Sequence, residues 1–576
     1  MPAWPPPRIR ISESLGWDLG KAGAIKQEEA DRMAGDGSLA GRARTPRRRV
    51  RVPLTRRDFL AGAAALAGTG AAGGWMLGGA HSPGARAGEA PKRGGKVIWG
   101  MLSDPTSVIP FGGVSGSNFE ITSLIYESLL RWDRRLTIQP ALAESWQIPD
   151  NKTYVFKLRK GVKFHSGKEL DADDVKYSLE LQKTPPPPGS VTSFYPKIAG
   201  VTAVDKYTVR VNMAEPDATM LGYLAWGRYS AIIPKGLYDR ADLRTHADGT
   251  GPFKLEEYIP NDHTRLSRYP DHWRREVPYL DEITMKVMLD EQARVAGLRS
   301  GAVDGAQLTS DAANSLAGDS SLQVLKGLTA VFREVEFTIK GDGKPWDNVK
   351  VRQAVSAAVN RQAIIENVYG GDAVYSSKIP QGYGTWPLSQ DALKLKWERY
   401  DVPKAKALMA EAGFGSGFSV TMQSIAHPTD YTQNAEVIKE QLKLININVT
   451  VQPLEIGTFA RNNGNGDFEW QSTGRGMRGD PSGFIADFDP NGSVSKAWYA
   501  GYNNKELIDL YFEGLHTTDQ GKRQQIYRRL QEIVLTEWPA MPLVNPMIYF
   551  VVRRRLHGMY VAYESTERGL IEAWAD

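Results

Sequence analysis

Hydrophobic residues recur along the chain with two different periods, and segments of both kinds are intermixed. Alternating or short apolar runs predict strands, because successive side chains of a strand point to opposite faces. The expected strands lie at 96–101, 153–159, 200–204, 207–213, 282–290 and 445–451. Spacings of three and four residues predict amphipathic helices. The expected helices lie at 120–132, 349–369, 402–412 and 431–444.

Local signals mark where several of these elements begin and end. Asp290 is placed to cap a helix that terminates at Gly301, so that a strand passes directly into a helix. Pro403 and Gly413 bound the helix expected at 402–412. Such alternation of strands and helices predicts sheets covered by helices, an α/β fold.

Residues 146–248 have a different pattern. Asp171 is placed to cap a helix that the prolines at 185–188 end. The strands at 200–204 and 207–213 are separated by a two-residue turn, which predicts a hairpin. We therefore expect an α+β unit inserted between two other parts of the chain.

Length and composition limit the class of protein. A chain of 576 residues is too long for one core, and about two to four structural units are expected. Hydrophobic residues make up 41% of the chain, which excludes a disordered or fibrous protein. No cysteine is present, which excludes disulfides, thiol catalysis, iron–sulfur clusters and cysteine-based zinc sites, as well as a lipid anchor on cysteine.

The net charge of +5 comes from the N-terminal region. The densest basic run lies at 42–57, and the chain after residue 87 is slightly acidic. A nucleic-acid groove needs basic residues along the folded surface, so we exclude nucleic acid as a partner.

The basic run leads into an export signal. Arg56 and Arg57 precede a weakly hydrophobic stretch at 59–80, a pattern that resembles a twin-arginine signal. The small residues Ala85 and Ala87, separated by one residue, predict cleavage before Gly88 and a protein that is released into the periplasm. The alternative is a segment that is retained as an N-terminal anchor.

No local motif indicates catalysis. The eight histidines have no metal-ligand spacing, and neither a serine nucleophile elbow nor a phosphate-binding loop is present. We expect no enzyme activity, no metal and no cofactor. A secreted carbohydrate-active enzyme stays open as an alternative. Close acid pairs such as Asp487 and Asp489 do not establish the geometry of glycoside hydrolysis, but two carboxylates far apart in the sequence can flank a sugar bond.

Ordered motifs over most of the chain resemble family 5 of the extracellular solute-binding proteins, the oligopeptide, dipeptide and nickel-binding group. They are PALAESW at 140–146, YVFKLRKGVKFHSG at 154–167, GTGPFKL at 249–255, YPDHW at 269–273, LRSGAVD at 298–304, VRQAV at 351–355 and PAMPL at 539–543. The resemblance implies a two-lobed periplasmic-binding-protein clamshell, type II and cluster C-like, that closes around a ligand. Lobe I is expected at 88–145, 249–335 and 540–576, the inserted domain at 146–248, and lobe II at 336–539.

The loop GRGMRGDP at 474–481 departs from the family pattern. In peptide-binding members an acid in this loop holds the ligand's amino terminus, and here Met477 stands in its place. Arg475 and Arg478 surround that position and favour a carboxylate or phosphate, so we expect an anionic or neutral polar ligand such as an opine-like or peptide-like compound or an oligosaccharide. In the alternative alignment Asp480 binds the amine.

Family position adds further cleft candidates, which are Ser103, Asp104, Ser115, Asn118, Phe119, Tyr383 and Trp386. The resemblance implies a monomeric receptor that delivers its ligand to the permease of an ABC importer. A di- or oligopeptide receptor, a nickel-complex receptor and a sensor are the remaining alternatives.

Overall fold

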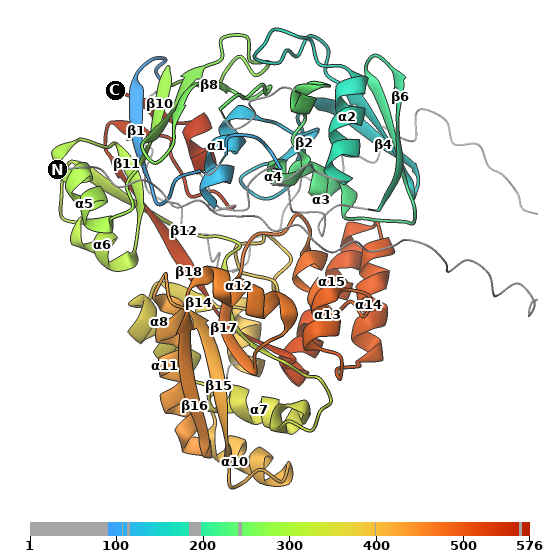
Figure 1. Ribbon diagram of the computed structural model, residues 1–576, viewed down its shortest axis with the longest axis vertical. Helices are drawn as coiled ribbons and strands as arrows, with labels where there is room; N and C mark the ends of the chain where they lie inside the picture. Colours follow the sequence, from blue (N-terminus) through green and yellow to red (C-terminus); the bar gives the residue numbers. More distant parts are fainter. Residues whose placement is uncertain are drawn as a thin grey trace, which may run out of the picture. The chain divides into compact units, whose positions relative to one another are not determined.

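The computed structural model describes residues 90–105, 107–111, 116–183, 197–239, 245–397, 399–563 and 567–576. The predicted export signal and Ser115 lie outside these residues. Within them, twelve strands form one mixed sheet (Figure 1). Its main path runs through β16 (Ile447–Leu454), β15 (Phe418–Ile425), β17 (Trp470–Arg475), β13 (Phe332–Phe337), β18 (Ala540–Arg553), β11 (Gly305–Leu308), β1 (Lys96–Met101), β10 (Glu282–Val287), β9 (His263–Arg268) and β8 (Phe253–Ile259).

Strand β18 joins the two halves of this sheet. Its first half pairs with β13 and β14 (Ala373–Tyr375), and its second half pairs with β11 and β12 (Leu322–Leu328). Nearly every residue of β18 is buried, as its long apolar sequence requires. Strand β1 lies between β10 and β11 and is parallel to both, an arrangement that needs crossover connections.

Helices cover both halves of the sheet. Helix α11 (Asp430–Leu442) packs on β15, β16 and β17, and α5 (Glu291–Ser300) packs on β11. The expected cap at Asp290 is confirmed, since its carboxylate accepts the amide hydrogen of Ala293 at 2.7 Å. The other main helices are α1 (Gly116–Ile125), α3 (Met220–Ala225), α4 (Gly227–Ser230), α6 (Ser310–Ser315), α7 (Val349–Ala358), α8 (Arg361–Tyr369), α10 (Val402–Glu411), α12 (Ile456–Asn465), α13 (Ser493–Trp498), α14 (Lys505–His516) and α15 (Gln520–Glu537).

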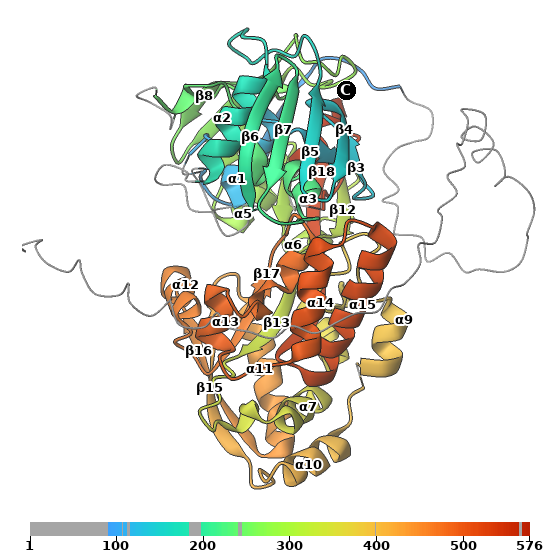
Figure 2. The same cartoon turned by 90° about the vertical axis from the view of Figure 1, so that its right-hand side faces the viewer.

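A separate antiparallel sheet lies in the region of the α+β unit expected at 146–248. It has the order β4 (Ala143–Asp150), β5 (Thr153–Leu158), β7 (Thr208–Met213) and β6 (Ile198–Asp205), with α2 (Ala172–Lys183) on one face (Figure 2). Tyr154, Phe156 and Leu158 are buried, as their alternation predicted. Asp171 caps α2 by accepting amide hydrogens at its first turn.

Two predicted helices were too long. The helix expected at 120–132 ends at Ile125, and β2 (Leu130–Trp132) follows and pairs with β3 (Ile138–Pro140). The helix expected at 349–369 is two helices, because Val359 is extended and Asn360 caps the second by accepting the amide hydrogen of Ala363. In both cases a continuous apolar pattern concealed a break in the backbone.

Large aromatic residues fill the core on both sides of β18. Trp470 packs edge-to-face on Phe337 in one cluster, and Trp99 packs in the same way on Phe550 in another. Among the described residues no helix has the length and apolar character needed to cross a membrane.

Candidate ligand-binding site

Two cavities flank Gly479 and Asp480, one on each side. The aromatic cavity, of about 430 Å³, is lined mainly by Trp132, Trp146, Tyr154, Leu221, Tyr383, Trp386, Pro481 and Arg523. The charged cavity, of about 390 Å³, is lined mainly by Lys197, Asp217, Trp226, Arg475, Arg478, Asp487, Asp489 and Tyr511. Both have the volume of small-molecule sites.

Each cavity lies between the segment 217–226 and the loop that follows β17. Gly222 of α3 approaches this loop so closely that a Cβ atom there would lie 2.2 Å from the carbonyl oxygen of Gly479. The amide of Ala218 donates a hydrogen bond of 2.8 Å to the carbonyl of Leu515. The walls of the cavities therefore come from parts of the chain more than 200 residues apart.

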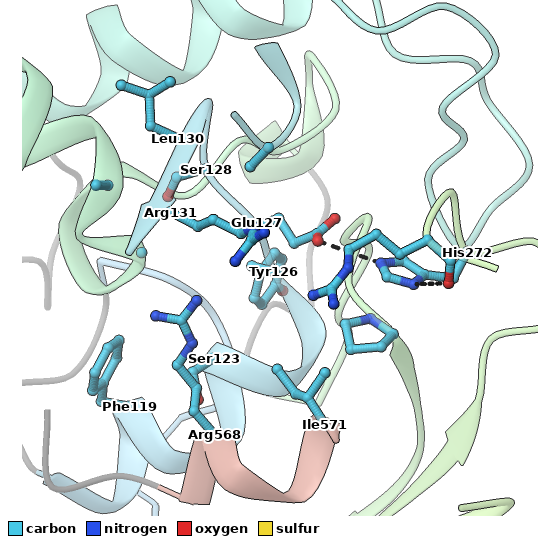
Figure 3. A pocket seen from close by; sticks show the side chains of 15 residues that line it. Phe119, Ser123, Tyr126, Glu127, Ser128, Leu130, Arg131, His272, Arg568 and Ile571 are labelled. Carbon is cyan, nitrogen blue, oxygen red and sulfur yellow. Dashed lines mark hydrogen bonds and ion pairs between the residues drawn. The ribbon is translucent and has the colours of Figure 1, made fainter. Parts of the chain in front are cut away.

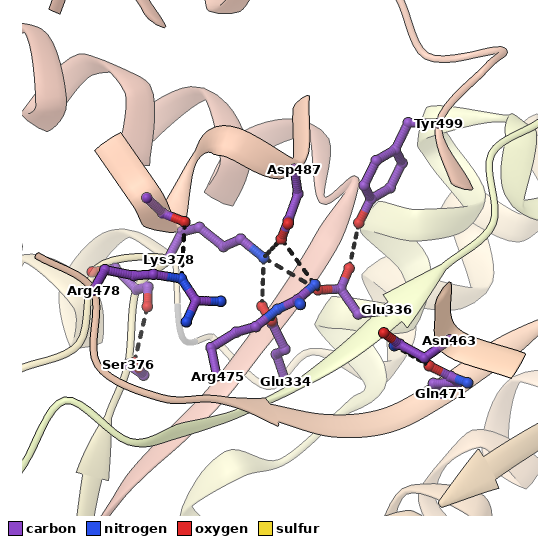
Figure 4. Close-up of polar contacts among 12 residues, drawn as sticks. Glu334, Glu336, Ser376, Lys378, Asn463, Gln471, Arg475, Arg478, Asp487 and Tyr499 are labelled. Atoms are coloured by element: carbon purple, nitrogen blue, oxygen red, sulfur yellow. Dashed lines mark hydrogen bonds and ion pairs between the residues drawn. The ribbon is translucent and has the colours of Figure 1, made fainter. Parts of the chain in front are cut away.

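Arg475 is part of a buried ionic cluster at the edge of the charged cavity (Figure 4). Its guanidinium pairs with Glu334, Glu336 and Asp487, each at 2.8 Å. Lys378 completes the cluster, with its ammonium 2.8 Å from Glu334 and 3.2 Å from Glu336. The side chains of Lys378 and both glutamates are fully buried.

The two glutamates of the cluster differ in pKa. Burial and the neighbouring charge of Glu336 raise the pKa of Glu334 to about 8. Burial would also raise the pKa of Glu336, but Lys378 and Arg475 hold it below its usual value. The two cations thus stabilise the charged form of Glu336 most strongly.

The expectation that Arg475 and Arg478 favour an anionic ligand did not include these partners, because Arg475 already pairs with three carboxyl groups of the protein. The sequence did not indicate that Glu334 and Glu336 of β13 would neutralise Arg475. Arg478 also lines the charged cavity and donates hydrogen bonds to the carbonyls of Met477 and Gly483 at 3.2 and 3.3 Å. The side chain of Met477 is buried in the hydrophobic core and lines neither cavity.

Asp480 lines both cavities and already has a cationic partner. Its carboxylate lies 2.7 Å from the guanidinium of Arg523, and both side chains are buried. It also accepts the amide hydrogen of Ser482 at 3.0 Å and so caps η6 (Pro481–Phe484). An amine bound by Asp480 would have to share this carboxylate with Arg523.

Asp217 and Asp489 are site residues that the sequence did not indicate. Both line the charged cavity, and with Asp480 they surround Tyr511, whose pKa is raised by burial and by these three charges. Burial and the charge of Asp480 raise the pKa of Asp217. Only the fold brings these carboxylates together, since Asp217 lies more than 260 residues before the other two.

Tyr383 and Trp386 lie on one wall of the aromatic cavity. The ring of Tyr383 contacts Phe484 and Tyr563, with centroids 5.4 and 5.1 Å apart. Trp386 packs edge-to-face on Tyr527 at 5.7 Å. These contacts hold both rings in place beside the cavity.

The remaining candidates line neither of these two cavities. The hydroxyls of Ser103 and Ser117 lie 2.6 Å apart, and the amide of Asn118 donates to the carbonyl of Ser107 at 2.6 Å. Asp104 accepts a hydrogen bond from Tyr258 at 3.1 Å. Phe119 lines a smaller cavity, drawn in Figure 3.

Two of the motifs that carry the resemblance, at 249–255 and 269–273, meet around one half-buried carboxylate. Glu127 accepts hydrogen bonds from Trp273 at 2.8 Å and Thr250 at 3.1 Å, and it lies 3.3 Å from His272 (Figure 3). Burial opposes charge on either partner, but their pairing lowers the pKa of Glu127 and raises that of His272. These motif residues hold strands and loops together, which is a structural role.

Comparison with known proteins gives consistent results. The model for the middle region of the bacterial extracellular solute-binding proteins, family 5, matches residues 137–495. The glutathione-binding protein GsiB of Salmonella paratyphi A is 27% identical over 487 residues, which are 81% of this chain and 92% of GsiB.

Solved structures share the fold. DppA from Helicobacter pylori in complex with the peptide STSA is 25% identical, with a TM-score of 0.70 over 84% of this chain and 98% of DppA. AgaA from A. tumefaciens in complex with agropinic acid is 26% identical, with a TM-score of 0.71 over 84% of this chain and 99% of AgaA.

These matches confirm the α/β periplasmic-binding-protein fold with an additional small antiparallel sheet. The family consists of extracellular or periplasmic binding proteins, so the alternative of a carbohydrate-active enzyme is not supported. The chain belongs to family 5 of the bacterial extracellular solute-binding proteins.

Proposed function

We propose that this protein is the receptor of an ABC importer and captures a small zwitterionic solute, peptide-like or opine-like, between the segment 217–226 and the loop 474–489. The charged cavity is the observation that carries this proposal, because guanidinium and carboxylate groups line the same space. The names of the relatives support the class, since they include receptors for glutathione, a peptide and agropinic acid.

The carboxylate of the ligand binds on the side of Arg475 and Arg478. Arg475 is fixed by three ion pairs, so little side-chain entropy is lost when a ligand binds there. A carboxylate that reaches Arg478 gains a charge-assisted hydrogen bond in a site largely removed from water.

The amine of the ligand binds on the side of Asp217 and Asp489. These carboxylates face one another near Asp480, and an ammonium between them relieves their mutual repulsion. This position takes over the role of the acid that Met477 replaces in the loop.

Binding draws two lobes together. The boundaries expected from the sequence place the segment 217–226 in the inserted domain and the loop 474–489 in lobe II. They place β18 in lobe I, where its first half pairs with β14 of lobe II. A ligand that contacts both walls stabilises the state in which they meet, and the importer's permease then binds this state. Export by the twin-arginine route, release without an anchor and a monomeric receptor complete the proposal.

The test is mass spectrometry of the solute released when the gently purified protein is denatured, followed by calorimetry with that solute. A reference dipeptide is titrated beside its N-acetylated and its C-amidated forms. We expect each modification to weaken binding at least tenfold, because each removes one of the two charges.

Asp217→Asn and Arg478→Gln are expected to weaken binding in the same way. Arg529→Gln is the matched control, since Arg529 is exposed and pairs with Glu506 on α14. Recovery of neutral oligosaccharides, or equal affinity for the acetylated, amidated and unmodified dipeptides, would contradict a zwitterionic ligand.

A further inference from the structure

A second pair of cavities lies against the C-terminal residues of the chain. The larger, which we call the arginine cavity, has a volume of about 230 Å³, and the smaller, drawn in Figure 3, about 50 Å³. Arg131, Arg274 and Arg568 line both of them, and Arg134 lines the larger one. The arginine cavity has no lining residue in common with the charged cavity.

Among the described residues that line the arginine cavity, four are arginines and two are acids, Asp133 and Glu572. Arg274 also pairs with Glu276, outside this lining, at 3.0 Å. Glu572 pairs with Arg134 at 2.6 Å and lies 4.0 Å from Arg274. Asp133 accepts hydrogen bonds from groups in the segment 135–139 and serves to shape that turn.

One nitrogen of the Arg131 guanidinium has no hydrogen-bond acceptor. This nitrogen, Nε, is buried. Burial and the charges of Arg274 and Arg568 lower the pKa of Arg131. Glu572 and Asp133 raise it by less, so the pKa lies below its usual value. A buried guanidinium nitrogen without an acceptor, beside two further guanidiniums, is unfavourable until an anion is added.

The three guanidinium groups come from three different elements. Arg131 lies on β2, Arg274 follows β9, and Arg568 lies on η8 (Glu567–Ile571). Arg131 and Arg568 extend toward the same space from these elements (Figure 3). Convergence of side chains from separate elements is what a built binding site requires.

We propose that the arginine cavity binds a small oxyanion, a phosphate or a carboxylate, through Arg131, Arg274 and Arg568. Guanidinium groups bind both anions through paired, charge-assisted hydrogen bonds, and an anion among the three groups relieves the repulsion that Arg274 and Arg568 exert on Arg131. The site is separate from the solute site of the charged cavity, so both can be occupied together.

Isothermal titration calorimetry of the full chain with inorganic phosphate and with citrate tests this site. Ionic strength is held constant with chloride, because screening alone weakens surface binding. We expect one saturable site, and a preference between the two anions identifies phosphate or carboxylate chemistry. Arg131→Gln is expected to weaken binding at least tenfold, and Arg568→Gln tests the same site should the buried Arg131 be needed for folding.

Two variants separate this site from other basic groups. Arg529→Gln removes an exposed arginine and is expected to bind the anion as the unaltered protein does. Arg478→Gln removes an arginine of the charged cavity and shows whether the anion binds there instead. Absence of saturable binding, or affinity unchanged in both Arg131→Gln and Arg568→Gln, overturns the proposal. Loss of binding in Arg478→Gln alone also overturns it, because the anion would then occupy the charged cavity.

Discussion

Gly222→Ala tests whether the contact between α3 and the loop after β17 belongs to ligand capture. The added Cβ atom would lie 2.2 Å from the carbonyl oxygen of Gly479, whereas ordinary contact begins at 3.4 Å. The obstacle is a backbone atom, which no rotamer change removes, so the two segments have to move apart. Overpacking of this kind costs about 1–3 kcal/mol.

In a receptor that closes on its ligand, this cost appears in the closed state and therefore in the affinity. At about 1.4 kcal/mol for each factor of ten, we expect ligand affinity to fall between about fivefold and more than a hundredfold. The melting temperature without ligand should change little, because an open receptor avoids the clash. Calorimetry with the ligand recovered from the protein, together with a melting curve in its absence, measures both quantities.

Gly200→Ala is the matched control. Gly200 lies on β6, and an added Cβ atom there meets nothing within 4 Å. Unchanged affinity in Gly222→Ala would refute the reasoning. A loss of stability without ligand as large as the loss of binding free energy would show instead that the contact belongs to the core of the fold.

Three further predictions concern the buried charges. Burial raises the pKa of Glu334 to about 8, so its protonated form stabilises the fold below pH 4.5, and this stabilisation is lost as the pH rises toward 8. Glu334→Gln should flatten the pH dependence of the free energy of unfolding, measured by denaturant titration from pH 5 to 9. Asp480→Asn leaves the buried Arg523 without its countercharge and should lower the free energy of unfolding by about 3–5 kcal/mol in urea titrations, whereas Glu506→Gln at the surface should have no measurable effect. Burial lowers the pKa of His165 to about 4, so its contribution to stability should be lost as the pH falls from 6.5 toward 4, and His165→Gln should reduce that loss in thermal melts.

Much of the local structure follows from residues close together in the chain. The alternation at 153–158 specifies a half-buried strand, and Asp171 and Asp290 specify helix starts through their own carboxylates. The helix expected at 349–369 was wrong in its continuity. Asn360 was visible as a cap residue, but the apolar pattern on both sides of it outweighed that signal.

The charge of the candidate site depended on contacts that no local pattern contains. Glu334 and Glu336 lie two positions apart on β13, so the sequence could indicate that they share a face. It could not indicate that this face meets Arg475, which β17 brings into register from 140 residues away. In the fold Arg475 therefore has three carboxyl partners within the protein.

The sequence by itself determined the family, the α/β class and most strand and helix positions, because these depend on periodicity, capping and contiguous motifs. Only the tertiary structure decided which charges face one another, that Asp217 and Asp489 share a cavity with Arg478, and that Arg131, Arg274 and Arg568 converge. The physical reason is that electrostatic interactions act through space over a few ångströms. The residues that lie within that range are set by strand pairing and packing between distant segments, and not by their spacing along the chain.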